Sequence, residues 1–170
     1  MKFKYTQLFI FIVFISFVYS CCDCKKKKDD KKQIVALVGK MSWTDWKQNT
    51  KWKDYDANNY KIDSEKIKQL KSVLKNKKIA FVVFSANWCP DSESEGPKFY
   101  KLIAELGFPI ENITLYGVAR NKKEPTGEAE KYKIEKVPSV IILNDGTEIG
   151  RIVEFPFISW EDDLLTILLE

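Results

Sequence analysis

One run of residues must be buried on both of its sides. Residues 79–84, Ile-Ala-Phe-Val-Val-Phe, are all apolar and are rich in β-branched and aromatic side chains. Such a run is typical of a strand that is covered on both faces of a sheet. A helix follows, and its core stripe consists of Phe99, Leu102, Ile103 and Leu106. It ends near Gly107 and Pro109, and the strand-like residues 113–118 come next, so the sequence predicts a βαβ unit with parallel strands.

Further elements are predicted on either side of this unit. Asp63 or Ser64 caps a helix that runs to about Asn76, and residues 128–133 form a short helix. The strand-like residues 139–143 and 147–153 flank Asn-Asp-Gly, which is typical of a hairpin turn. Ser159, with Asp162 three residues later, caps a final helix, whose apolar positions are Trp160, Leu164, Leu165, Ile167 and Leu168. The order is βαβ, α, β-hairpin, α.

Residues 1–20 have the pattern of a secretion signal. Lys2 and Lys4 form a positive end, and an apolar core runs from Leu8 to Tyr19. A membrane-spanning helix needs roughly 20 apolar residues, and this core is shorter. The pattern therefore favours a cleaved signal over a permanent anchor.

The end of the apolar core resembles the processing box of bacterial lipoproteins. Val18-Tyr19-Ser20-Cys21 has an apolar residue at minus three, a small one at minus one and a cysteine in the lipidated position. Tyr19 is bulkier than is usual there, and ordinary cleavage and a signal anchor are the alternatives. The resemblance implies lipidation at Cys21 and an exported lipoprotein held at a membrane of the cell envelope or periplasm.

Residues 21–32 follow the predicted cleavage point and form a charged spacer. This stretch is too polar to bury apolar surface. Cys22 and Cys24 lie in it, and a C-x-C metal or redox pair is the alternative interpretation, although two cysteines do not complete a zinc site. The globular domain is expected over residues 33–170, where lysines alternate with acidic residues, so no nucleic-acid partner is predicted.

Two composition features limit the function. The chain has no histidine, which excludes hydrolases that depend on imidazole and metal centres with histidine ligands. Aromatic residues are concentrated between residues 43 and 60, namely Trp43, Trp46, Trp52, Tyr55 and Tyr60. We expect these rings to cover one end of the core; a carbohydrate or peptide surface is the alternative.

Between the buried strand and its helix stand residues 87–92, Asn-Trp-Cys-Pro-Asp-Ser. Cys89-Pro90-Asp91-Ser92 occupies the place of the Cys-x-x-Cys tetrad in the thioredoxin superfamily, which the chain resembles. Pro97 lies eight residues after Cys89, like that family's helix proline. Val137-Pro138 matches its cis-proline, with a trans turn as the alternative, and Asn-Asp-Gly matches its hairpin.

The resemblance covers roughly residues 65–170, and the Trp-Cys-x-Asp-Ser pattern is most similar to a thioredoxin-like branch of bacterial envelope proteins. It implies an α/β thioredoxin fold with a central mixed β-sheet flanked by helices, and no cofactor or metal ion. By the same resemblance, Cys89 and Ser92 are the catalytic positions, and Trp88, Pro90 and Asp91 complete the motif. The backbone at Val137 and Pro138 is expected to hold an extended substrate peptide.

Two departures from the family pattern affect the chemistry. Ser92 replaces the resolving cysteine, and Val83 replaces the buried aspartate that assists proton transfer. A helix N-terminus favours a thiolate at Cys89, while Asp91, Glu93 and Glu95 oppose it, so the sequence leaves the net effect open.

Two hypotheses follow from a single active-site thiol. In the first, the chain carries out thiol-disulfide exchange or isomerisation on envelope proteins with thiols or disulfides, and a thiol from outside the tetrad releases Cys89. In the second, it is a redox-inactive scaffold or binding module. A peroxidase or glutathione-linked enzyme is disfavoured, because Val82 and Ala86 stand where a peroxiredoxin-like motif has Pro and Thr or Ser.

Overall fold

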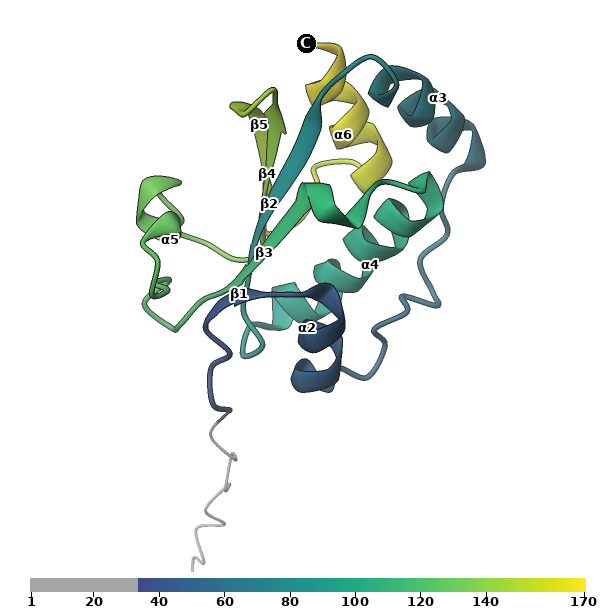
Figure 1. The fold of residues 1–170 in the computed structure, drawn as a ribbon. Helices are drawn as coiled ribbons and strands as arrows, with labels where there is room; N and C mark the ends of the chain where they lie inside the picture. The colour runs from purple at the N-terminus through teal and green to yellow at the C-terminus, as the bar shows by residue number, and fades with distance from the viewer. Residues whose placement is uncertain (1–33) are drawn as a thin grey trace, which may run out of the picture. The chain divides into compact units, whose positions relative to one another are not determined.

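The structure is a computed structural model, and it describes residues 34–170. Its centre is a five-stranded sheet with the strand order β1-β3-β2-β4-β5 (Figure 1). The strands are β1 (Gly39–Met41), β2 (Ile79–Ser85), β3 (Ile113–Gly117), β4 (Ser139–Asn144) and β5 (Thr147–Val153). Strands β2 and β3 are parallel, and the other neighbouring pairs are antiparallel. The predicted mixed sheet is therefore confirmed.

Helices cover both faces of the sheet. Figure 1 shows the short helix α5 (Glu128–Lys131) on one face and the longer helices on the other. The longer helices are α2 (Trp43–Thr50), α3 (Ser64–Leu74), α4 (Pro90–Leu106) and α6 (Trp160–Leu169). A single 3-10 turn, η1 (Ile110–Asn112), precedes β3. The predicted order of elements is confirmed from α3 onward, whereas β1 and α2 were not predicted.

The predicted signal peptide, the lipidation of Cys21 and the spacer over residues 21–32 lie outside the described residues. Within residues 34–170, no helix is long and apolar enough to cross a membrane.

Strand β2 is buried on both faces, as its sequence predicts. Phe81 and Val83 belong to the core beneath the four helices, where they pack with side chains of α4 and α6. Val82 and Phe84 belong to a second core on the α5 face. Phe81 and Phe84 are 1% and 0% exposed, and burying a side chain of this size stabilises a fold by roughly 1.5–3 kcal/mol.

The aromatic residues between 43 and 60 cover one end of the larger core, as expected. Trp43, Trp46, Trp52 and Tyr55 are buried, and Tyr60 packs against them while partly exposed. The rings contact one another directly, since the centroids of Trp46 and Trp52 are 5.7 Å apart with their planes nearly perpendicular. The burial of these rings contradicts the alternative of a carbohydrate or peptide surface.

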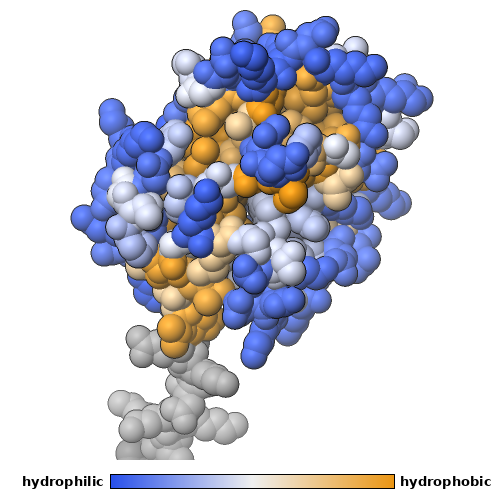
Figure 2. All heavy atoms as spheres, in the orientation of Figure 1, coloured by the Kyte–Doolittle hydropathy of each residue, from blue (hydrophilic) through white to orange (hydrophobic). Residues whose placement is uncertain are grey.

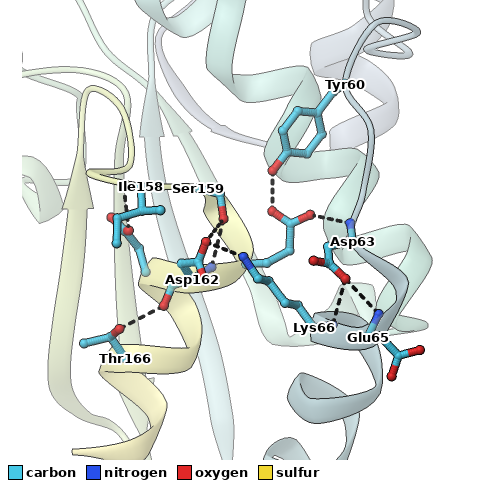
Figure 3. Close-up of polar contacts among 10 residues, drawn as sticks. Tyr60, Asp63, Glu65, Lys66, Ile158, Ser159, Asp162 and Thr166 are labelled. Atoms are coloured by element: carbon cyan, nitrogen blue, oxygen red, sulfur yellow. Dashed lines mark hydrogen bonds and ion pairs between the residues drawn. The ribbon is translucent and has the colours of Figure 1, made fainter.

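The N-terminus of α6 is tied to the segment before α3 (Figure 3). Glu161 is 2% exposed, and its carboxylate accepts hydrogen bonds from the Tyr60 hydroxyl and the Asp63 backbone N–H. Lys66 forms an ion pair with Asp162 at 2.6 Å. The predicted cap is also present, because Ser159 Oγ accepts from the Asp162 backbone N–H at 3.1 Å. Burial and the Glu161 hydrogen bond both raise the pKa of Tyr60.

This contact gives a test of stability. Tyr60→Phe removes a donor from a buried carboxylate, and such a loss costs about 1–3 kcal/mol. We expect the free energy of unfolding, measured by urea denaturation, to fall by that amount. Tyr100→Phe is the matched control, since Tyr100 is also a partly buried tyrosine that packs against the core, beside Trp43. Equal losses in the two variants would contradict the role of the Tyr60–Glu161 bond.

Candidate active site around Cys89

Cys89 lies at the carboxyl end of β2 and is the N-cap residue of α4. Its backbone is extended, with φ −99° and ψ 122°, and Pro90 begins the helix. Proline fits this first helical position because it has no N–H and its φ is fixed near the helical value. The Cys89 N–H donates to the Ala86 carbonyl at 3.1 Å, and the Cys89 carbonyl accepts from Glu93 N at 3.1 Å. The sulfur is thereby held where the strand becomes the helix.

The Cys89 side chain points at the segment before β4. Its thiol donates a hydrogen bond to the Val137 carbonyl oxygen at 3.2 Å, and Cys89 is 9% exposed. The Val137–Pro138 bond is cis, which confirms that prediction. The Pro138 carbonyl accepts from the Glu154 N–H at 2.6 Å. The structure thus brings the predicted catalytic cysteine and the predicted peptide-binding segment into contact.

Ser92 has a structural contact instead of a contact with Cys89. It is 0% exposed, and its Oγ accepts a hydrogen bond from the Ala86 N–H at 3.2 Å. This bond closes the loop that carries residues 87–89, because it joins the start of that loop, directly after β2, to the first turn of α4. A buried N–H without an acceptor is costly, so the serine stabilises the loop that holds the sulfur.

Trp88 is anchored to the loop after β3. Its Nε1 donates to the Val118 carbonyl at 3.0 Å. The Arg120 guanidinium and the Lys122 ammonium lie 5.1 and 5.4 Å from the ring centroid. These are cation–π distances. Two positive charges therefore lie over the ring of Trp88, the residue next to Cys89. Neither cation could be assigned to the site from the sequence, since only the folded loop brings them to Trp88.

Asn87 holds the first described residues of the chain against the site. Its Nδ2 donates to the Val35 carbonyl at 2.8 Å, and its Oδ1 accepts from the Leu37 N–H at 3.0 Å. The Leu37 backbone also lies against Gly117 of β3, where a Cβ would come within 2.3 Å of the Leu37 oxygen. Ile34 and Val35 are exposed, and hydrophobic residues gather at that end of the face drawn in Figure 2.

Only two of the three acidic residues predicted to oppose a thiolate lie in the first turn of α4. Asp91 and Glu93 are there and are exposed. Glu95 is buried instead, where it pairs with Lys98 and accepts from Trp160 Nε1 at 3.0 Å. Its charge is therefore compensated by Lys98 and Trp160. The expectation that Glu95 opposes a thiolate at Cys89 is corrected accordingly.

The rest of the motif adds no second ionisable group beneath Cys89. Val83 is 3% exposed in the core under the helices, and Pro97 lies inside α4 and is buried. Within residues 34–170, no three His, Cys, Asp or Glu side chains are placed to hold one metal ion.

The geometry of this strand, cysteine, helix and cis-proline agrees with a direct comparison of sequences. The family model described as Thioredoxin matches residues 39–163, which is most of the chain. The chain belongs to the thioredoxin family. Membership supports a redox-type function in general terms and the α/β thioredoxin fold in particular.

Individual family members are similar over about half of the chain. A thioredoxin of Echinococcus granulosus is 30% identical over 84 residues, covering 49% of this chain and 73% of its own. A thioredoxin of Mycoplasma pneumoniae is 28% identical over 89 residues, covering 52% and 81%. Mitochondrial thioredoxin 3 of Saccharomyces cerevisiae aligns in structure with a TM-score of 0.35 at 20% identity, over 51% of this chain and 76% of that one.

The loop that supports Trp88 depends on Glu124. Its carboxylate accepts hydrogen bonds from the backbone N–H groups of Thr126, Glu128 and Ala129, and so caps α5. Burial raises the pKa of Glu124, but the bonds from Thr126, Ala129 and Glu128 lower it more, so that the pKa lies below its usual value. This stabilisation is present above the unfolded-state pKa near 4.5 and is lost as the pH falls through the folded-state pKa.

Glu124→Gln tests this cap. We expect the variant to lose about 1–2 kcal/mol of unfolding free energy at pH 7, since hydrogen bonds to a charged acceptor are worth more than neutral ones. The difference from wild type should shrink as the pH is lowered below 4.5, measured by urea denaturation at a series of pH values. Glu105→Gln, at an exposed position of α4, should show little difference at any pH. A Glu124→Gln deficit that stays constant with pH would contradict the ionic cap.

Ser92→Ala tests the closure of the active-site loop. It leaves the Ala86 N–H without its acceptor, which costs about 1–3 kcal/mol, and the loss should appear in thermal or urea unfolding. Ser72→Ala, at an exposed position of α3, is the matched control and should change stability little. If both variants are as stable as wild type, the Ser92 bond does not hold the loop.

Proposed function

We propose that this chain is a membrane-tethered envelope protein that uses the single thiol of Cys89 for exchange with thiols and disulfides of other envelope proteins. The observation that carries the proposal is the position of Cys89. It is the N-cap of α4 and is hydrogen-bonded to the carbonyl that precedes a cis-proline, while Ser92 stands where a second thiol would be. The predicted signal and Cys21 support the envelope location.

The proposed exchange starts with loss of the thiol proton. A thiolate at this N-cap faces the positive end of the α4 macrodipole. Its sulfur attacks one sulfur of a substrate disulfide, an S–S bond forms to Cys89, and the other substrate sulfur leaves as a thiolate that takes up a proton. A second thiol, on the substrate or on a small molecule, then attacks this mixed disulfide and restores the Cys89 thiol. Isomerisation needs no net oxidant or reductant.

The segment before the cis-proline is suited to a peptide partner. Within residues 34–170 the Val137 N–H has no acceptor, and the Val137 carbonyl is bound only by the Cys89 thiol. Ionisation of Cys89 removes that donor and leaves both backbone groups available. An extended peptide pairs with such groups as an added strand, which would bring its disulfide to the sulfur.

A redox-inactive binding module is the second candidate, and the burial of the thiol favours it. Cys89 is 9% exposed and its hydrogen is donated to Val137, so the sulfur is reached only after this contact opens. The two candidates differ in one requirement: exchange needs the sulfur, whereas a binding module needs only the surface around it.

Partner trapping through Cys89 separates the candidates. In cells treated with an alkylating agent to stop exchange, we expect mixed disulfides on non-reducing gels for the wild type and none for Cys89→Ser. Ser92→Cys supplies a second thiol and should shorten the lifetime of these adducts, because the new thiol can release the partner. Alkylation of Cys89 in the folded chain, followed by mass spectrometry of its peptide, should show that the sulfur reacts without unfolding.

The opposite pattern supports the binding module. If Cys89→Ser retains the same partners in a pull-down, and the wild type forms no adduct, the thiol has no role in the function. Ser92→Ala is the control for Ser92→Cys, since it removes the same serine hydroxyl from Ala86 without adding sulfur.

A further inference from the structure

A cavity of about 670 Å³ lies at the other end of β2 from Cys89. Its walls are the end of α3, the beginning of β2 and the turn after α4. Strand β2 has seven residues, and at about 3.3 Å per residue it separates the cavity from the active site by roughly 20 Å. The cavity is therefore independent of the site proposed above. Its volume falls in the range of small-molecule sites, about 300–1,000 Å³.

The rim of the cavity is strongly basic. Lys71, Lys75, Lys77 and Lys78 line it, and Asp145 is the one carboxylate among its lining residues. Asp145 is paired with Lys78 at 3.2 Å. The other three lysines have no ion-pair partner within residues 34–170. Residues 34–170 as a whole contain slightly more acidic than basic side chains, so the positive charge here is a local concentration.

The floor of the cavity is apolar. Leu106 and Ile79 are 7% and 4% exposed, and Phe108 is half-buried against the core. These side chains are recessed between the lysines rather than projecting from the surface. A recessed apolar floor favours a ligand that enters the cavity over a flat membrane surface that rests on it.

We propose that this cavity binds a small amphiphile with an anionic head and an apolar body. The head, a phosphate or carboxylate, is held by Lys75 and Lys77, and the body lies on Leu106 and Phe108. Charge complementarity accounts for the head, and removal of apolar surface from water accounts for the body. An anion alone would contact only the lysines of the rim, and an apolar molecule alone would contact only the floor.

Titration with decyl phosphate below its critical micelle concentration tests the proposal on the full chain. We expect saturable shifts of the backbone amide NMR signals of Ile79, Ala80, Gly107 and Phe108. Inorganic phosphate and decyl maltoside, which carry only the charge or only the chain, should bind at least tenfold more weakly. Cys89→Ser should bind decyl phosphate as tightly as wild type, since the cavity does not depend on the thiol.

Lysine variants identify the binding site. Lys75→Ala with Lys77→Ala should weaken decyl phosphate binding about fivefold, which corresponds to roughly 0.5 kcal/mol for each exposed charge. Lys53→Ala with Lys61→Ala makes the same change in net charge at exposed positions outside the cavity and should leave affinity within about twofold of wild type. Equal effects of the two pairs, or shifts spread over other surfaces, would overturn the assignment.

A vesicle experiment distinguishes the source of the anionic head. The chain, with Cys21 replaced by serine so that no lipid is attached, is sedimented with phosphatidylcholine vesicles that contain phosphatidic acid. Monomeric decyl phosphate should bind in the absence of vesicles and should displace any vesicle-bound protein. If the chain binds vesicles but not monomeric decyl phosphate, the basic surface is a membrane contact and the small-molecule site is ruled out. If it binds neither, the proposal is wrong.

Discussion

Strand β2 sends Phe81 and Val83 into the core beneath four helices and Val82 and Phe84 into the core on the α5 face. Burial on both faces leaves this strand no place except the middle of the sheet, between β3 and β4. Its backbone groups then pair on both sides. Because β2 cannot shift without moving both cores, the residues at its carboxyl end start from a fixed position.

Position 92 shows how the active-site loop depends on that fixed end. Ser92 Oγ is a good acceptor for the Ala86 N–H, whereas a cysteine sulfur in its place would be a weak one. The same residue that removes a second thiol from the tetrad therefore strengthens the loop. The loop in turn holds the Cys89 thiol on the Val137 carbonyl. In the proposed exchange, the partner has to take the place of this contact, so the site is closed until a suitable peptide competes for Val137.

The elements with strong local patterns could be predicted from the sequence, and those that depend on distant contacts could not. The apolar run of β2, the helical stripe of α4 and the hairpin turn carry their own periodicity, and the cis bond at Val137–Pro138 followed from a motif. Strand β1 has only three residues, Gly-Lys-Met. It is a strand through its antiparallel pairing with β3, which no local pattern predicts. The Asn87 contacts with Val35 and Leu37 join residues about 50 positions apart, which no local pattern encodes.

Helix α4 links the two chemically distinct ends of the domain, because Cys89 is its N-cap and its last residues lie beside the lysine cavity. A structural explanation of the lysines is that they offset the negative end of this helix, whose last turn contains no basic residue. A helix C-terminus is equivalent to about half a negative charge. The positive charge of Lys71, Lys75 and Lys77 is several times larger than this half charge. Asp145 is already paired with Lys78. Most of the positive charge at the cavity is therefore left for a ligand, and an anion is the species that this end of the domain favours.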